Sequence, residues 1–293
     1  MTSRLSEQPL TQTSQADVVQ VAIKALLYEV TANPKPGLVD PTGNASHPDM
    51  NVFNFIDSAL AMQPYLQACY RCGAQFQKKD LTQLFQELRP LGKTAEKRMY
   101  QVTKQVNTHK GAIFALGILV ATVALTVQQL AQPTLSAVIT RERLLTKDLV
   151  RKDFAVLQQR PPQTAGERQY LQYGTTGIRG EAETGFATVM NFGLPWLVDS
   201  QGSTNERLLL ALIAIVTNSN DSNLIKRAGN RQIVATVHGQ WQKLLVTYSQ
   251  TKQFPQQQWQ QICHDFALQK LSLGGSADLL IVTIFLAKLI QKF

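Results

Sequence analysis

The run GAIFALGILVATVALTV, residues 111–127, most constrains the fold, because the helix it predicts is apolar on every side. With 17 residues it lies at the short limit for crossing a bilayer, and Gly117, Thr122 and Thr126 interrupt its apolar sequence. A helix that is apolar all round is also what the centre of a large helical domain requires. We therefore favour a buried central helix over a membrane span.

Helical periodicity dominates the chain on both sides of this run. Residues 17–30 repeat apolar side chains at intervals of three and four, and Asp17 is placed to cap that helix. Strand-like alternation of convincing length is missing. We expect an all-α fold, a single compact multi-helix domain over residues 16–293 around the central helix. Further helices are predicted at residues 52–76 with a bend at Pro64, 81–106 with a break at 89–92, 147–159, 181–191, 206–216, 230–249, 256–271 and 277–292.

Three other features bear on organisation and location. Residues 1–15 are polar and lack the apolar stretch of a signal peptide, so we expect a flexible N-terminal tail. Residues 160–176, RPPQTAGERQYLQYGTT, are expected to form a long surface loop. Three cysteines fit a reducing compartment, which predicts a cytoplasmic protein. A zinc site from Cys69, Cys72, Cys263 and His264 is conceivable, but the two pairs lie far apart in the sequence and reduced thiols are the favoured reading.

The net charge and its distribution along the chain indicate which kind of partner the protein binds. The net charge is +9 and the pI is near 9.5, yet lysine and arginine are scattered and form no basic block. Dispersed positive charge concentrates phosphate-bearing small molecules. We therefore favour an anionic metabolite over a nucleic acid, and the sequence holds no basic patch interleaved with aromatic residues.

Five stretches place charged residues beside Gly, Pro or Asn at helix boundaries: EVTANPKPGLVD with SHPDM, NTHKGAIFALG, GIRGEAETGF, NDSNLIKRAG and GGSADLL. In NTHKG, His109 and Lys110 occupy the first turn of the apolar helix, where a cation is locally unfavourable. Free backbone N–H groups together with these two side chains make a good anion site. The alternative is a surface lysine that solvent screens.

Two glycines in GIRGEAETGF permit unusual backbone angles, so that Arg179 can be presented to a phosphate in bidentate contact. Glu181 and Glu183 are two residues apart and point in different directions on a regular helix. Of the two, Glu181 at the helix boundary is expected to face the site. In the alternative reading, both glutamates only favour the helix N-terminus by charge.

NDSNLIKRAG and GGSADLL each combine a capping signal with candidate ligands. Asp221 and Asn223 can supply oxygen ligands to Mg²⁺, or Asp221 can simply cap the helix whose end carries Arg227. Ser276 is predicted to cap the last helix, with Asp278 in its first turn.

The segment from Asn33 to Asn51 holds Lys35, Asp40, His47 and Asp49 within one proline-rich connector. Its prolines fix an extended course, and its acceptors favour oxygen coordination of Mg²⁺ or hydrogen bonding to a sugar over a zinc site. Glu29, one turn before this connector, is expected to face the same cleft.

Common nucleotide and hydrolase motifs are missing from the sequence. There is no GxxxxGK[ST], no GxGxxG after a strand, no GxSxG and no HExxH. A phosphate-handling protein of this kind needs a nucleotide site made from helix ends.

The five stretches, in this order from Glu29 to Leu280, resemble the triphosphoribosyl-dephospho-CoA synthase family, which serves citrate lyase and malonate decarboxylase. Two departures are Ser222, where threonine is expected, and the absence of a proline before the glycines of GGSADLL. The resemblance implies a pentosyltransferase that moves the triphosphoribosyl group of ATP to the 2′-hydroxyl of 3′-dephospho-CoA and releases adenine. It also implies Mg²⁺ as cofactor, and a downstream transferase and acyl carrier protein of citrate lyase as partners, with neither nucleic acid nor membrane involved.

The resemblance carries roles onto matching residues of this chain. Contacts with the nucleotide are assigned to a set of mostly charged side chains, and the cations of this set are assigned to its phosphates. Carboxylates are assigned to catalysis and to metal, because glycosyl transfer passes through an oxocarbenium-like centre and the retained triphosphate needs Mg²⁺. The nucleotide-binding set is Lys35, Asp40, His47, His109, Lys110, Arg179, Asn223, Arg227 and Asp278; the catalytic set is Glu29, Asp49, Glu181 and Asp221; and the metal set is Asp40, Asp49, Glu181 and Asp221.

Other functions stay open at this point. An all-α, Mg²⁺-dependent phosphohydrolase or an ADP-ribosyl hydrolase-like enzyme would suit the aspartates equally well and would use water as acceptor. A basic helical nucleic-acid-binding protein would bind in a salt-sensitive manner. A membrane protein is the third alternative.

Overall fold

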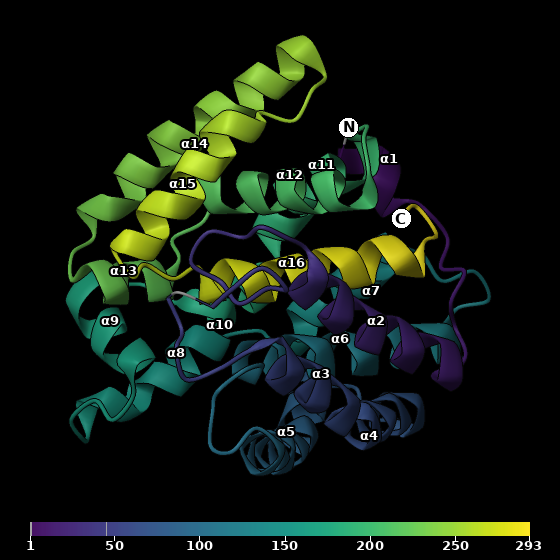
Figure 1. Cartoon of the computed structure of the whole chain (residues 1–293). Coiled ribbons are helices and arrows are strands. Elements are labelled where there is room, and N and C mark those ends of the chain that lie inside the picture. The colour runs from purple at the N-terminus through teal and green to yellow at the C-terminus, as the bar shows by residue number, and fades with distance from the viewer. Residues whose placement is uncertain (1, 45) are drawn as a thin grey trace.

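The computed structural model describes residues 2–44 and 46–293, and within these ranges every regular element is a helix (Figure 1). Two isolated bridges, Pro9 with Thr134 and Asp40 with Gly43, are the strand-like pairings among these residues. The all-α prediction is confirmed, and the helices form one compact domain.

The predicted central helix is α6, Lys110–Gln129. By length and composition it could cross a membrane, but 78% of its most apolar window is buried inside the protein. One contact shows how closely it is covered. A Cβ added at Gly73 of α4 would lie 2.0 Å from the main-chain oxygen of Ala121, so the two helices approach there only because position 73 lacks a side chain.

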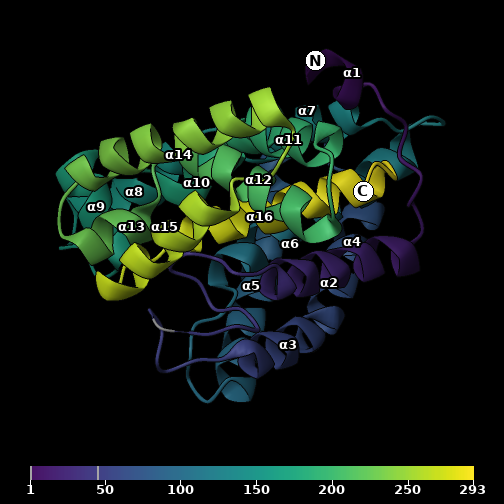
Figure 2. The ribbon, with the colours of Figure 1, turned by 45° about the horizontal axis from the view of Figure 1, so that its top comes forward.

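A second helix that is apolar on nearly all sides, α16, is the last helix of the chain, and it lies beside α6 in the core. The pair α14 and α15 covers one side of this core, and α3, α4 and α5 lie on the opposite side; both views show this arrangement (Figure 1, Figure 2). In chain order the elements are α1 (Thr2–Ser6), α2 (Gln15–Thr31), α3 (Val52–Ala61), α4 (Gln63–Gln75), α5 (Thr82–Val102), α6 (Lys110–Gln129), α7 (Leu135–Leu145), α8 (Leu149–Phe154), the 3₁₀ helix η1 (Ala155–Gln158), α9 (Ala165–Tyr173), α10 (Gly177–Glu183), the π-helix η2 (Val189–Gly193), α11 (Leu194–Asp199), α12 (Thr204–Thr217), α13 (Ser222–Ala228), α14 (Gln232–Thr251), α15 (Gln256–Leu268) and α16 (Gly274–Leu289).

Two proline-based predictions have different outcomes. The bend at Pro64 is confirmed, since α3 ends at Ala61 and Pro64 stands in the first turn of α4, where its missing N–H is harmless. The break at residues 89–92 is wrong, because α5 continues through Pro90. Pro90 and Gln86, whose carbonyl loses its helical partner, both lie on the exposed side of α5, where solvent can satisfy that carbonyl.

The connector at residues 160–176 is not a plain surface loop, because α9 lies within it. Thr164 accepts a hydrogen bond from the N–H of Glu167 and the Glu167 side chain accepts from the N–H of Thr164, a reciprocal capping box that starts this helix. The N-terminal segment, expected to be a tail, begins with α1. Leu5 and Leu10 are buried, and the N–H of Leu10 donates to the main-chain oxygen of Pro133.

Candidate active site at the helix ends

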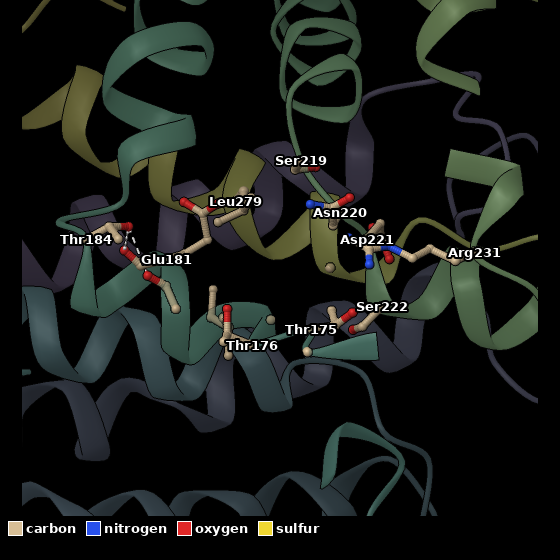
Figure 3. A pocket seen from close by; sticks show the side chains of 15 residues that line it. Thr175, Thr176, Glu181, Thr184, Ser219, Asn220, Asp221, Ser222, Arg231 and Leu279 are labelled. Atoms are coloured by element: carbon tan, nitrogen blue, oxygen red, sulfur yellow. Dashed lines mark hydrogen bonds between the residues drawn. The ribbon is translucent and has the colours of Figure 1, made fainter. Parts of the chain in front are cut away.

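Two cavities adjoin where α6, α10, α13 and α16 begin. The first, which we name the Glu181 pocket, has a volume of about 280 Å³ and is lined by residues 174–178, 180, 181, 184, 219–222, 231, 275 and 279 (Figure 3). The second, the His109 pocket, has a volume of about 120 Å³. It collects residues from the other motifs, chiefly Glu29, His47, His109, Lys110, Asn223 and Asp278.

One shared wall separates the two pockets. Asp221, Ser222 and Gly275 line the Glu181 pocket, while their chain neighbours Asn223 and Gly274 line the His109 pocket. The wall is tightly packed, because a Cβ at Gly274 would lie 2.8 Å from the side-chain nitrogen of Asn223 and one at Gly275 would lie 3.2 Å from the Asp221 carboxylate. The motifs NDSN and GGSADLL therefore divide one cleft into two compartments.

Asp221 builds this wall with both of its oxygens. Its Oδ1 accepts hydrogen bonds from the N–H groups of Asn223 and Leu224, so it caps α13 as the sequence allowed. Its Oδ2 accepts from the N–H and the hydroxyl of Ser276, at 2.6 and 2.8 Å. The prediction that Ser276 caps the last helix is therefore wrong. The helix begins at Gly274, and Asp221 satisfies the free N–H of Ser276 from outside.

His109 is the N-cap residue of α6 and is buried, with 1% of its surface exposed. Its Nδ1 lies 2.8 Å from the Ser58 hydroxyl, and its ring meets Phe55 edge to face. Its Nε2 is buried and has no hydrogen-bond partner among the described residues, and His109 is one of the residues that line the pocket. Burial lowers the pKa of His109 to about 3, with Lys35 contributing. His109 is therefore neutral near pH 7, and can offer a substrate a hydrogen bond but no positive charge.

Lys35 forms a buried pair with Glu29, a residue that lines the His109 pocket. Its Nζ is 2.5 Å from Glu29 Oε1 and donates a second bond to the main-chain oxygen of the same residue. Burial raises the pKa of Glu29, and Lys35 opposes that rise. Asp40, also buried, accepts from the N–H groups of Lys35, Thr42 and Gly43 and from the Thr42 hydroxyl. Lys35 and Asp40 thus fix the connector, with the Lys35 ammonium directed at Glu29.

Asp278 is half-buried in the wall of the His109 pocket. Burial raises its pKa well above the usual range of an aspartate, and the neighbouring carboxylates Glu29 and Asp221 raise it further. It lies against the start of α6, where a Cβ at Gly111 would come 1.9 Å from its Oδ2. Glu29 and Asp221, drawn from two other motifs, are thus both close enough to Asp278 to disfavour its charged form.

Glu181 faces the pocket named for it (Figure 3). Its Oε1 accepts from the Thr188 hydroxyl at 2.6 Å and its Oε2 from the Thr188 N–H at 3.2 Å. Burial raises the pKa of Glu181, and both bonds to Thr188 lower it. Each oxygen retains a lone pair that can be directed at a ligand.

The three remaining cations that were predicted to bind phosphate are Lys110, Arg227 and Arg179. Lys110 lines the His109 pocket, is exposed, and pairs with Glu96 at 2.9 Å. Arg227 is exposed and its Nη2 lies 3.3 Å from Nδ1 of His47, whose Nε2 is 3.0 Å from the Ser272 hydroxyl. Burial and Arg227 lower the pKa of His47. Arg179 lies in neither pocket: its Nε donates to Asp153 at 2.7 Å, on the other side of α10.

Comparison with known proteins decides the family. The family described as ATP:dephospho-CoA triphosphoribosyl transferase matches residues 15–293. The chain belongs to this transferase family. It is 47% identical over 271 residues to a protein of Lactiplantibacillus plantarum named "Probable 2-(5''-triphosphoribosyl)-3'-dephosphocoenzyme-A synthase", covering 92% of this chain and 95% of that one. A protein of Vibrio cholerae with the same name is 37% identical, covering 94% of this chain and 89% of that one.

A longer relative is also similar to this triphosphoribosyl transferase. "Protein CitXG" of Leuconostoc mesenteroides subsp. cremoris is 46% identical over 289 residues, which is 95% of this chain but 60% of that protein. The chain therefore spans about three fifths of that relative. No solved structure matches the chain.

The transferase's predicted metal ligands do not come together. Asp49 is exposed, Asp40 is held within its loop, and Asp221 and Glu181 belong to the wall and the rim of one pocket. In the described part of the chain, no group of three or more His, Cys, Asp or Glu side chains could hold a metal ion. Because Mg²⁺ at phosphates is often held by one or two carboxylates plus substrate oxygens, Glu181 with its free lone pairs fits such an ion.

Sequence reasoning missed several side chains of the Glu181 pocket. Arg231 and Asn220 reach into it, and the hydroxyls of Thr175 and Ser219 are buried without a hydrogen-bond partner in residues 2–44 and 46–293 (Figure 3). Thr175 stands between Gly174 and Gly177, both at positive φ, so the spacing of these glycines was the feature of the sequence that could have indicated Thr175 as a site residue. Arg231 lies outside every motif, so no feature of the sequence indicated it.

Proposed function

We propose that this chain transfers the triphosphoribosyl group of ATP to the 2′-hydroxyl of 3′-dephospho-CoA and releases adenine, at the junction of the Glu181 and His109 pockets. Membership of the transferase family supports the reaction class. The observation that carries the placement is the presence of three carboxyl groups in the linings of the two adjoining pockets, Asp221 in one and Glu29 with Asp278 in the other. This cluster is acidic although the protein as a whole carries a net charge of +9.

The crowded carboxylates suit the transition state of glycosyl transfer. When the bond to adenine breaks, positive charge develops on the ribose carbon and its ring oxygen. Negative groups fixed in a dry site stabilise that charge without reorganising. Lys35 balances Glu29, which leaves Asp221 and Asp278 to face the substrate side of the wall. Once Asp278 has given its proton to the departing base, the site has the sign of charge that an oxocarbenium-like centre requires.

Asp278 supplies the proton for the departing base. Because burial and the neighbouring carboxylates Glu29 and Asp221 raise the pKa of Asp278, it is the carboxyl group of this site best suited to carry a proton, donate it to a ring nitrogen of adenine and become anionic as the sugar becomes cationic. His109, neutral and with a free Nε2, orients the base or the sugar by a hydrogen bond. The sequence-based assignment of His109 to a phosphate is thereby changed to an uncharged contact.

The triphosphate occupies the Glu181 pocket. Its lining of glycine backbone, threonine and serine hydroxyls and Arg231 offers hydrogen-bond donors suited to phosphate oxygens. Glu181 and the phosphate oxygens would hold Mg²⁺ there, and the ion would neutralise part of the triphosphate charge. Lys110 and Arg227, both exposed at the His109 pocket side, add positive charge at the entrance.

The biological setting follows the resemblance alone. We place the protein in the cytoplasm and assign its product to the prosthetic group of citrate lyase, to be used by a downstream transferase and an acyl carrier protein. Nucleic acids and membranes have no part in this function.

Purified protein mixed with ATP, Mg²⁺ and 3′-dephospho-CoA tests the reaction. Chromatography with mass detection should show adenine released only when dephospho-CoA is present. ADP, free phosphate or pyrophosphate as the product would refute the proposal and favour a phosphohydrolase, and free triphosphoribose without dephospho-CoA would favour a nucleoside-type hydrolase.

Asp278→Asn tests the mechanism at this site. Asparagine matches a protonated aspartate in shape but has no acidic proton, so the fold is retained and kcat falls by about 10²-fold or more. Asp57→Asn, an exposed carboxylate on α3, is the matched control and leaves kcat unchanged. Equal activity of the Asp278 variant and the control would remove Asp278 from proton transfer.

A further inference from the structure

A third cavity lies between α5, α6 and the start of α10, and the reaction scheme above does not use it. It has a volume of about 160 Å³, and we name it the Arg89 pocket. Phe85, Phe114 and Ile118 form its apolar part, and Arg89, Lys93 and Arg179 bring three cations to it. Arg179 belongs to the motif GIRGEAETGF, so one family motif contributes to this cavity as well as to the Glu181 pocket.

Two arginines of this pocket share one carboxylate. Nε of Arg179 donates to Oδ2 of Asp153 at 2.7 Å, and Nη2 of Arg89 donates to Oδ1 of the same residue. Asp153 is largely buried, with 11% of its side chain exposed, while Arg89 and Arg179 are 35% and 42% exposed. The trio therefore carries a surplus positive charge that faces the cavity.

The guanidinium groups are held in fixed orientations with donors to spare. The Arg89 guanidinium lies 4.5 Å from the centre of the Phe85 ring, and that of Arg179 lies 5.8 Å from Phe154 and 5.9 Å from Phe114. Each bonds Asp153 through a single nitrogen, and its other N–H groups have no partner within the part of the chain the structure describes. A guanidinium so constrained loses little freedom when it binds a phosphate oxygen.

The remaining charges of the pocket add to this surplus. Lys93 is exposed and makes no ion pair with any described residue. Glu96, the other acid of the lining, is already paired with Lys110 at 2.9 Å. The pocket thus combines an apolar floor with unneutralised cations, which is the chemistry of a site for a phosphate ester of an organic molecule.

The Lys110–Glu96 ion pair joins this pocket to the reaction site. Lys110 lines the His109 pocket and Glu96 lines the Arg89 pocket. In the acceptor, the attacking 2′-hydroxyl and the diphosphate are attached to the same ribose, so they must occupy neighbouring cavities. ATP, whose triphosphate is assigned to the Glu181 pocket, does not need this third cavity.

We propose that Arg89, Lys93 and Arg179 bind the diphosphate of the acceptor nucleotide, 3′-dephospho-CoA, and hold it while its ribose hydroxyl enters the His109 pocket. The proposal rests on the function proposed above for the identity of the acceptor. The competing account is that Asp153 merely clamps α5, α8 and α10 together, in which case the arginines affect stability and no substrate.

Lys93→Ala and Arg89→Gln separate these accounts, with Arg98→Ala as the control. Arg98 is an exposed cation on the same helix and does not line the pocket. Isothermal titration of 3′-dephospho-CoA into each purified full-length protein without ATP measures the acceptor site directly. Loss of one charge-assisted contact should weaken acceptor binding by about tenfold in each pocket variant, with the control unchanged.

The kinetic readout uses adenine release with one substrate varied at a time. KM for dephospho-CoA should rise by about tenfold in both pocket variants, while KM for ATP stays within about twofold of the unsubstituted protein. Lys93 has no structural partner, so its variant stays folded and keeps the test valid if Arg89→Gln lowers Tm. Normal acceptor affinity in Lys93→Ala and in a folded Arg89→Gln, or an equal rise in both KM values, would overturn the proposal.

The two proposals fail in different ways. If the unsubstituted protein releases no adenine yet binds dephospho-CoA with a dependence on Arg89 and Lys93, the proposed reaction is wrong and the acceptor site stands. If adenine is released normally and neither substitution changes acceptor affinity, the reaction stands and the acceptor site is wrong.

Discussion

The buried pair of Lys35 and Glu29 gives the sharpest test of how the polar interior of this protein is held together. The two side chains are 0% and 3% exposed, and a single ammonium bonds both the carboxylate and the main-chain oxygen of Glu29. Lys35→Met keeps the length of the side chain and removes its charge. The Glu29 carboxylate is then left in the interior without its counter-charge.

The expected loss can be stated as a change in melting temperature. Removing one partner of a buried ion pair costs about 3–5 kcal/mol of unfolding free energy. An unfolding entropy of about 2.1 cal/mol/K per residue gives about 0.6 kcal/mol/K for 293 residues. Lys35→Met should therefore lower Tm by about 5–8 °C.

A double-mutant cycle shows whether the loss comes from the stranded carboxylate. Calorimetry at pH 7 would compare Lys35→Met, Glu29→Gln and the double variant. Because the double variant has no unpaired charge, it should be more stable than Lys35→Met alone by about 2 kcal/mol or more. ATP affinity, measured by titration on each folded variant, tests the sequence-based prediction that Lys35 binds a phosphate. A Lys35→Met protein that melts like the unsubstituted one and fails to bind ATP would refute the buried-pair account.

Three further predictions follow from single contacts. Because the pKa of His109 falls from 6.5 to about 3 on folding, only the unfolded chain takes up a proton between these values, so stability falls as pH falls through that window, by up to about 1.4 kcal/mol per pH unit. His109→Gln should flatten this acid limb in urea unfolding curves measured from pH 7 to 4, and parallel limbs would contradict it. Gly73→Ala should lower the free energy of unfolding by more than about 2 kcal/mol, because the new Cβ meets the backbone of α6. Gly239→Ala on α14, where the space around the glycine is open, should raise it by about 0.5–1 kcal/mol. Thermal unfolding of the two variants measures both changes. Lys110→Ala should raise the apparent Kd for ATP by about two- to tenfold without changing Tm, and an unchanged Kd would take Lys110 out of the nucleotide site.

Much of the fold was predictable because its strongest signals are local. An all-round apolar run has to be buried, and α6 is. The helix-end motifs were also informative, since Asn, Asp and Gly concentrate where backbone N–H groups are free, and all five motifs contribute residues to the two adjoining pockets. The helix α9 was missed although its capping box, Thr164 with Glu167, is legible in the sequence.

The direction in which each side chain points, and the partner with which it pairs, were harder to predict from the sequence. The rule that residues two apart on a helix point in different directions was applied to Glu181 and Glu183, and it applies equally to Arg179 and Glu181. The structure follows the rule, with Arg179 in the Arg89 pocket and Glu181 on the opposite side of α10. Pairing needs three-dimensional information. Nothing in the spacing of Glu29 and Lys35 tells whether an ammonium six residues away turns inward to a carboxylate or outward to a phosphate.

The distribution of charge argues for cleavage of the glycosidic bond of ATP over cleavage of its phosphate bonds. Phosphoryl transfer is catalysed by cations and metal ions that surround the reacting phosphorus. Here the cations Arg231, Lys110 and Lys93 are exposed at the edges of the pockets, and Arg227, also exposed, contacts His47. The centre between the two pockets holds Glu29, Asp221 and Asp278 instead, and its lysine, Lys35, is committed to Glu29. A phosphate placed against that centre would meet carboxyl groups in place of the cations it needs, whereas a ribose losing adenine would meet a proton donor and carboxylate oxygens. The edges can therefore retain the triphosphate intact while the centre acts on the sugar.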